Sequence, residues 1–207
     1  MIYSFKIAKF WLLALVICFC MNVQGQENYK NTLKIFRKNY VQTHDVVKGD
    51  STKFLKFFPI YEKYAVKAVF VKLEKPIEFK IPTSSGKAKE AIKIGSLSFN
   101  LEGKDYVLSV YQLKALLTTE KYHDYVFMPF TDLTSGLKSY GGGRYLDFTL
   151  SEITKSNFII DFNKAYNPSC MYAEGFNCPI PPRENDLLVK IKSGEKIYSL
   201  YYKKHIE

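Results

Sequence analysis

The stretch LSFNLEGKDYVLSVYQL, residues 97–113, decides the expected fold. Apolar side chains alternate with polar ones along both halves, and the dipeptide Glu102-Gly103 separates the halves. A period of two is typical of a β-strand with one buried and one solvated face, and a short glycine-containing turn between two such strands is typical of a hairpin. The stretch therefore predicts an antiparallel β-hairpin.

Segments of similar character flank this hairpin on both sides. Further strands are expected at residues 64–71, 77–81, 125–130, 158–161, 187–191 and 196–201. The last two are expected to form a second hairpin that turns at Ser193-Gly194. Regularly spaced short strands with local turns predict a mainly β fold, an antiparallel barrel or sandwich of about eight or more short strands.

One helix is expected before the first strand, over residues 27–44. Tyr29, Leu33, Phe36 and Tyr40 recur at steps of three and four, and basic side chains occupy the other faces. This spacing is typical of an amphipathic helix. We expect it to cover one side of the sheet.

Residues 1–25 have the pattern of a secretory signal peptide. Lys6 and Lys9 precede an apolar run, and small residues follow that run as a possible cleavage site. The run is too short to span a bilayer, which takes about 20 apolar residues; the alternative is an uncleaved anchor. We therefore expect an exported protein, periplasmic or secreted, whose residues 26–207 form a single domain with no transmembrane segment.

The charge of the mature chain is moderately basic. The whole sequence has 30 Lys+Arg against 20 Asp+Glu, so loss of Lys6 and Lys9 leaves 28 against 20, a net charge of +8. The cations are mainly dispersed lysines, not an arginine-rich stripe, so we expect no nucleic-acid partner. Contact with anionic envelope polymers, or simple solubility, explains the charge. The sequence indicates no particular cofactor or oligomeric state.

The first candidate site lies in TDLTSGLKSYGGGRYLDF, residues 131–148. Its triple glycine permits close approach of the backbone to a ligand, and Arg144 can grip a carboxylate or phosphate with its forked donors. The spacing matches no phosphate-binding loop. The alternative is a tight loop in which Asp132 or Asp147 pairs with Arg144. The ligand-binding candidates here are Asp132, Tyr140, Arg144 and Asp147.

The second candidate site is DFNKAYNPSCMYAEGFNCPIPPREN, residues 161–185. It has neither a helical nor an alternating period, so other parts of the chain must hold it in place. Its ligand-binding candidates are Asn163, Asn167 and Asn185, and its catalytic candidates are Cys170, Cys178, Asp161 and Glu184.

Three roles are open for Cys170 and Cys178. Their separation of eight suits a disulfide in an oxidising compartment. A zinc site would need the CxxC spacing and a nearby histidine, which the segment lacks, so no metal is predicted. A reactive thiol would need a base, which the neighbouring carboxylates can supply.

Several motifs resemble a known family. YGGGRYLDF, IIDFNKAYNPSC, NCPIPPREN and SGEK are similar in order and content to the C-terminal signature of domain-of-unknown-function family 1684, an uncharacterised bacterial and archaeal family. The resemblance extends back through PTSSGK at residues 82–87 and covers most of the mature chain. It implies a fold and boundaries but no established activity. Family members usually carry an aromatic residue where Ser169 stands, so the resemblance does not imply ring stacking there. Members without export signals also carry the cysteine pair, which leaves a site and a simple staple equally open.

Two functional hypotheses follow. The first is an exported binding or structural envelope module in which a rim of polar side chains holds a small polar or anionic ligand; the rim comprises Asp132, Arg144, Asp161, Asn163 and Asn167. The alternative is a hydrolase or transferase with a cysteine nucleophile, Asp161 or Glu184 as the base and Arg144 as the anion anchor. Both hypotheses expect Arg144 and the cysteine pair to face a common hollow.

Overall fold

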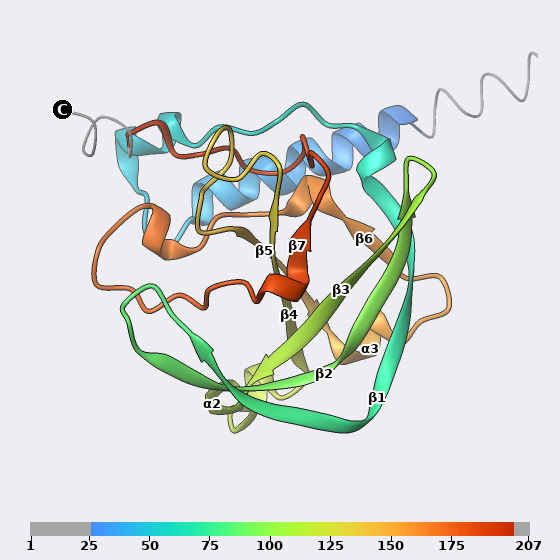
Figure 1. Ribbon diagram of the computed structural model, residues 1–207. Coiled ribbons are helices and arrows are strands. Elements are labelled where there is room, and N and C mark those ends of the chain that lie inside the picture. Colours follow the sequence, from blue (N-terminus) through green and yellow to red (C-terminus); the bar gives the residue numbers. More distant parts are fainter. Residues whose placement is uncertain (1–25, 201–207) are drawn as a thin grey trace, which may run out of the picture.

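A computed structural model describes residues 26–200 of the protein. The expected signal peptide, residues 1–25, and the end of the last expected strand, residue 201, lie outside the described residues. Within residues 26–200, seven strands form one curved, mainly antiparallel sheet, an open half-barrel (Figure 1). The strands are β1 (Ala65–Pro82), β2 (Ala88–Leu101), β3 (Lys104–Leu113), β4 (Tyr125–Asp132), β5 (Arg144–Thr149), β6 (Ile159–Asp161) and β7 (Asp186–Leu187).

The expected fold class is confirmed, and the expected strand number and closure are wrong. The strand order β5-β4-β3-β2-β1-β6 does not return on itself, so the sheet is not a closed barrel, and β7 adds to it by pairing with β4 in parallel. Two short α-helices, α2 (Lys114–Leu117) and α3 (Leu150–Ile153), follow β3 and β5. Short 3₁₀ helices lie at η1 (Gly49–Phe54), η2 (Glu62–Tyr64), η3 (Glu120–Tyr122), η4 (Phe162–Lys164), η5 (Ser169–Met171) and η6 (Arg183–Asn185).

The hairpin from which the fold was inferred is present as β2 and β3. Leu97 pairs with Leu108, and both side chains are fully buried. Glu102 and Gly103 both have positive φ angles, of 53° and 81°, which a two-residue turn between twisted strands requires. The amide of Gly103 donates to the side chain of Asn100 at 3.0 Å and completes the turn.

The expected strands at residues 64–71 and 77–81 belong to a single strand, β1. Its pairing with β2 shifts register between Lys72 and Ile77, and there the two strands bend sharply together (Figure 1). Gly95 of β2 is essential to this bend: a Cβ there would lie 2.4 Å from the carbonyl oxygen of Val71 and 2.5 Å from the ring of Phe70. The bend therefore requires a residue without a side chain.

The expected C-terminal hairpin is wrong. Only Asp186–Leu187 forms a strand, and residues 188–198 are irregular apart from one bridge at Glu195. Polar side chains take the place of a ladder, because Asp132 accepts a hydrogen bond from the amide of Ile191 and Arg144 donates to the carbonyl oxygen of the same residue. The alternation of apolar residues in this segment therefore indicates which side chains are buried, and does not indicate that the segment pairs as a strand.

Strand β5 was not expected. It follows directly after the triple glycine and pairs with β4 along its whole length, from Phe130 opposite Arg144 to Tyr125 opposite Thr149. The glycines concealed this strand, because glycine is depleted in strands.

The N-terminal helix, residues 26–43, lies across one end of the half-barrel (Figure 1). Leu33 is 1% exposed, and the helix is tied down by Tyr29, whose hydroxyl donates to Asp161, and by Arg37, which donates to the carbonyl oxygen of Phe58 at 2.8 Å. The expected helix is thus confirmed, and it covers one end of the half-barrel and not one side of the sheet. Among residues 26–200, no helix combines the length and the apolar character needed to cross a membrane.

Candidate functional site

Arg144 is a structural residue at the centre of the molecule. Its side chain is 1% exposed, and its Nη2 lies 3.3 Å from Asp132 Oδ1. The guanidinium also donates to the carbonyl oxygens of Ile191, Ser193 and Glu195. Asp132 is therefore its carboxylate partner and Asp147 is not, and neither Arg144 nor Asp132 stands on a rim that a ligand can reach.

The triple glycine serves packing in the same way. A Cβ on Gly142 would lie 2.5 Å from the ring of Tyr140, and one on Gly143 would lie 2.5 Å from Pro181. Tyr140 packs against an apolar cluster that includes Val47 and Met171. The glycines thus make room for side chains of the protein itself.

Asn163 and Asn185 are also buried and committed to the backbone. Asn185 is fully buried, accepts from the amide of Ser109, and donates to the carbonyl oxygens of Ser109 and Pro129 at 2.8 and 2.7 Å. Asn163 is 1% exposed, accepts from the amide of Tyr61 and donates to the carbonyl oxygen of the same residue. Both side chains join segments that are distant in sequence.

Asn167 belongs to a buried network around Glu195. Oε2 of Glu195 accepts from the amide of Asn167 at 2.9 Å and from the hydroxyls of Tyr40 and Tyr172 at 3.0 and 2.7 Å. Glu195 is 0% exposed, and this burial raises its pKa to about 7, although the three donors and the charge of Arg144 oppose the shift. Sequence reasoning missed Glu195, because Lys190, Lys192 and Lys196 around it give no sign that this acid is buried.

Cys170 and Cys178 form a disulfide, with their Cα atoms 6.2 Å apart. The disulfide role expected from their spacing is present, and in this form neither sulfur is a free nucleophile. Among residues 26–200, no group of three or more histidine, cysteine or acidic side chains is arranged to hold a metal ion.

The four catalytic candidates are held by different partners. Glu184 accepts from the hydroxyl of Tyr111 and from Lys93, whereas Asp161 caps η4 by accepting from the amide of Asn163 at 3.0 Å. Of the two pockets described next, one includes Cys170 and the other Asp161, and Arg144 lines neither. The expected common hollow of Arg144 and the cysteines is therefore not formed by these pockets.

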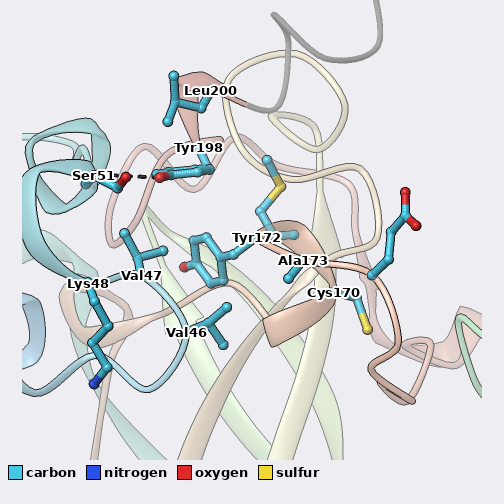
Figure 2. A pocket seen from close by; sticks show the side chains of 11 residues that line it. Val46, Val47, Lys48, Ser51, Cys170, Tyr172, Ala173, Tyr198 and Leu200 are labelled. Atoms are coloured by element: carbon cyan, nitrogen blue, oxygen red, sulfur yellow. Dashed lines mark hydrogen bonds between the residues drawn. The ribbon is translucent and has the colours of Figure 1, made fainter.

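The larger pocket, which we call the disulfide pocket, encloses about 900 Å³ beside Cys170. Figure 2 shows Tyr198 above Tyr172 and Val47, Val46 below them, and Cys170 at the edge of the group. The rings of Tyr172 and Tyr198 pack edge to face, with their centroids 5.3 Å apart. The remaining lining residues are Lys48, Ser51, Met171, Ala173, Glu174 and Leu200.

The second pocket, which we call the acidic cleft, encloses about 470 Å³ between the N-terminal helix, β5 and β6. Four carboxylates and one lysine lie in its wall, so its formal charge is −4 + 1 = −3 when all are ionised. The charged lining residues are Asp45, Asp147, Glu152, Asp161 and Lys164, and the apolar and aromatic ones are Phe36, Tyr40, Leu146, Phe148, Phe158, Ile159 and Tyr166. The cleft thus brings together two residues that the sequence had singled out, Asp147 and Asp161.

Asp147 is held in the cleft by two tyrosine hydroxyls. It accepts hydrogen bonds from the hydroxyls of Tyr125 and Tyr166, at 2.8 and 2.7 Å. The surrounding protein displaces solvent and raises the pKa of Asp147, while the two tyrosine hydroxyls oppose that shift. Asp147 is exposed as a residue, and the two hydroxyls fix the orientation of its carboxylate.

Two of the other charged groups in the cleft have structural duties as well. Glu152 completes a capping box with Thr149 at the start of α3. The ammonium group of Lys164 lies 5.6 Å from the centre of the Phe36 ring. These contacts fix the walls of the cleft.

Comparison with solved structures gives a neighbour of the same fold. The solution NMR structure of the uncharacterized protein from gene locus rrnAC0354 of Haloarcula marismortui is similar to this chain, with a TM-score of 0.61 and 26% sequence identity. The similarity covers 84% of this chain and 96% of the other. No curated protein matches the sequence. A family model described as protein of unknown function (DUF1684) matches residues 51–196. That match, which spans the half-barrel and the disulfide loop, shows that the chain belongs to the DUF1684 family.

Proposed function

We propose that the protein is an exported binding module and that its acidic cleft binds a small polar ligand carrying a positive charge. The observation that carries the proposal is the meeting of four carboxylates with aromatic walls in one cleft of about 470 Å³. A cleft of this volume suits a small molecule.

The charge of the cleft favours a cation over an anion. The mature chain has a net charge of +8, from 28 basic and 20 acidic residues after removal of Lys6 and Lys9, yet the cleft is formally negative. A concave site lined by one sign of charge attracts ligands of the opposite sign. The rings of Phe36, Tyr40 and Tyr166 add faces on which a cation or a polar ring can rest.

This proposal replaces the anion site that Arg144 suggested. The two terminal nitrogens of Arg144 are bonded to Asp132 and to backbone carbonyl oxygens, and the side chain is 1% exposed, so an incoming phosphate or carboxylate cannot reach it. The alternative of a cysteine hydrolase or transferase loses its nucleophile while Cys170 and Cys178 are bonded to each other. If no ligand binds in the experiment described next, a purely structural role in the envelope becomes the better explanation.

The test is a thermal-shift screen of the purified protein, followed by calorimetric titration. The panel contains primary amines, guanidinium compounds and amino sugars, with neutral sugars, nucleotides and organic acids as comparators. At about 100 times Kd a ligand adds about 2.7 kcal/mol of stability, which raises Tm by roughly 5–10 °C for a domain of this size. We expect such shifts among the cations, and shifts confined to anions would contradict the proposal.

Three variants locate the site. Asp147→Asn removes a negative charge from the cleft and is expected to weaken binding about tenfold, whereas Lys164→Gln removes the opposing charge and is expected to strengthen it several-fold. Glu90→Gln, at an exposed position of β2 outside the cleft, is the matched control and should leave Kd unchanged. Equal effects of the Asp147 and Glu90 changes would exclude the cleft as the site.

A further inference from the structure

Two loops that are distant in sequence meet at the disulfide. The tip of the β1–β2 hairpin, residues 83–87, lies against the loop that Cys170 and Cys178 close (Figure 1). The amide of Ser84 donates to the carbonyl oxygen of Cys178 at 2.9 Å, and Thr83 forms a bridge with Pro179. The conformation around the sulfurs is therefore held from both sides.

Each sulfur of the disulfide has a hydrogen-bonding partner. The amide of Cys170 donates to the sulfur of Cys178 at 3.2 Å. The hydroxyl oxygen of Ser84 accepts from the amide of Cys178 at 3.2 Å and lies 2.9 Å from the sulfur of Cys170. Because a disulfide sulfur has no proton, the hydroxyl of Ser84 is the donor in its contact with Cys170; the carbonyl oxygen of Phe176, at 3.4 Å, is a second and more distant acceptor for the same proton. Hydrogen bonds of this kind stabilise a thiolate more than a thiol.

The disulfide is accessible to a small molecule. Both cysteines are half-buried, and Cys170 lines the disulfide pocket, which encloses about 900 Å³ (Figure 2). Figure 2 shows the sulfur of Cys170 at the outer edge of this pocket, pointing away from Tyr172 and Tyr198, and the sulfur of Cys178 carries the backbone donor. The two sulfurs are therefore suited to different roles, one to be attacked and the other to leave.

We propose that the Cys170–Cys178 disulfide is a thiol–disulfide exchange site for small thiols. A thiolate RS⁻ attacks the sulfur of Cys170, the S–S bond breaks, and its electron pair goes to the sulfur of Cys178, which leaves as a thiolate facing the amide of Cys170. A second thiolate then attacks the R sulfur of the mixed disulfide and releases RSSR and the thiolate of Cys170, which faces Ser84. Two RSH are oxidised, the protein disulfide is reduced, and the two protons of RSH end on the cysteines.

This proposal does not depend on the acidic cleft. Cys170 is not part of that cleft, and none of the carboxylates in the cleft lines the disulfide pocket. The exchange reaction and cation binding can therefore each be present without the other.

The test uses reduced glutathione as the thiol and the purified oxidised protein, without denaturant. Samples are quenched with a thiol-alkylating reagent at successive times, and peptide mass spectrometry identifies which cysteine carries glutathione. The expected result is exchange in the folded protein, monitored by circular dichroism, with the adduct on Cys170. Reduction that occurs only after unfolding, or an adduct mainly on Cys178, would overturn the proposal.

A pair of serine variants separates exchange from packing. Ser84→Ala removes the hydroxyl beside the Cys170 sulfur, and we expect release of the free dithiol to slow about fivefold, the effect of one hydrogen bond. Ser85→Ala is the matched control, because Ser85 bonds to Asn177 in the same turn and not to a sulfur. If both variants change the exchange rate equally, the hydroxyl of Ser84 has no specific role and the assignment fails.

Discussion

Glu195 is a buried acid at which three separate parts of the chain converge. Tyr40 reaches it from the N-terminal helix, Tyr172 from the disulfide loop, and Asn167 through its backbone amide. One carboxyl oxygen receives all three hydrogen bonds, and the other, Oε1, has no hydrogen-bond partner among the described residues. A neutral carboxyl group is less costly to bury in this way than a carboxylate.

The protonation of Glu195 predicts how stability depends on pH. Its folded pKa of about 7 lies above the ordinary value of 4.5, so the folded state holds a proton that the unfolded state releases. The stabilisation is complete below pH 4.5, declines as the pH rises, and is lost above pH 7, a change of about 3 kcal/mol. Urea unfolding between pH 4 and 8 measures it.

Glu195→Gln removes this ionisation and keeps the shape of the side chain. The variant should lose the fall in stability between pH 4.5 and 7, whereas Glu90→Gln, at an exposed glutamate, should retain it. Parallel pH profiles of the wild type and Glu195→Gln would show that Glu195 is ionised in the fold.

The pair formed by Arg144 and Asp132 carries a second prediction at this scale. Their side chains are 1% and 0% exposed, so Arg144→Met leaves Asp132 without its cation in a dry environment. The expected loss is about 3–5 kcal/mol of unfolding free energy. Lys63→Met, which breaks a half-exposed pair with Glu102, should cost less than about 1 kcal/mol. Similar losses in the two variants would mean that the buried pair does not organise the core.

At the scale of elements, the sequence predicted what local pattern decides. The β2–β3 hairpin was predicted because its alternation and its turn residues lie within 17 consecutive positions, 97–113. The C-terminal hairpin failed because contacts from far along the chain, those of Asp132 and Arg144, satisfy the backbone of residues 188–195 instead. Arg144 and Asp132, close to the triple glycine, suggested a ligand site because the sequence does not show that both side chains are buried.

For the candidate site too, the sequence indicated some residues, but not the tertiary contacts that surround them. Asp147 and Asp161 were predicted as site residues, and both line the acidic cleft. The aromatic rings of the N-terminal helix that line the same cleft are brought there by tertiary packing, which the sequence does not show. Asn163, Asn167 and Asn185 were predicted to bind a ligand, and their side chains donate to backbone carbonyl oxygens of the protein. Glu195 escaped notice because nothing adjacent in the sequence marks it as buried.

The bend shared by β1 and β2 depends on Gly95, so a substitution there should destabilise the fold. Gly95→Ala would place a Cβ 2.4 Å from the carbonyl oxygen of Val71, so the strands must separate or straighten. We expect a loss of at least 2 kcal/mol, about the cost of overpacking, measured by denaturant unfolding. Gly86→Ala at the hairpin tip has a positive φ of 75° but meets nothing within 4 Å, and should cost only about 1–2 kcal/mol. A smaller effect at Gly95 than at Gly86 would contradict the steric account of the bend.

For the whole molecule, the half-barrel is closed at one end by the N-terminal helix, and the acidic cleft lies where that helix meets β5 and β6 (Figure 1). The helix begins the part of the chain that would remain after cleavage at residue 25. We predict that protein isolated from outside the cytoplasm begins at Gln26, as N-terminal sequencing would show. A full-length chain that starts at Met1 and stays in the cytoplasm would contradict export.

The proposed function requires the acidic cleft to bind a small cationic ligand. The most direct measurement is an NMR titration of the labelled protein with the best cation from the thermal-shift screen. Saturable shifts are predicted at the amides around Asp147, Asp161, Lys164 and Tyr166, and in Asp147→Asn they should need about tenfold more ligand to reach half of their full size. Saturable shifts that cluster elsewhere, or that persist unchanged in the variant, would contradict the account.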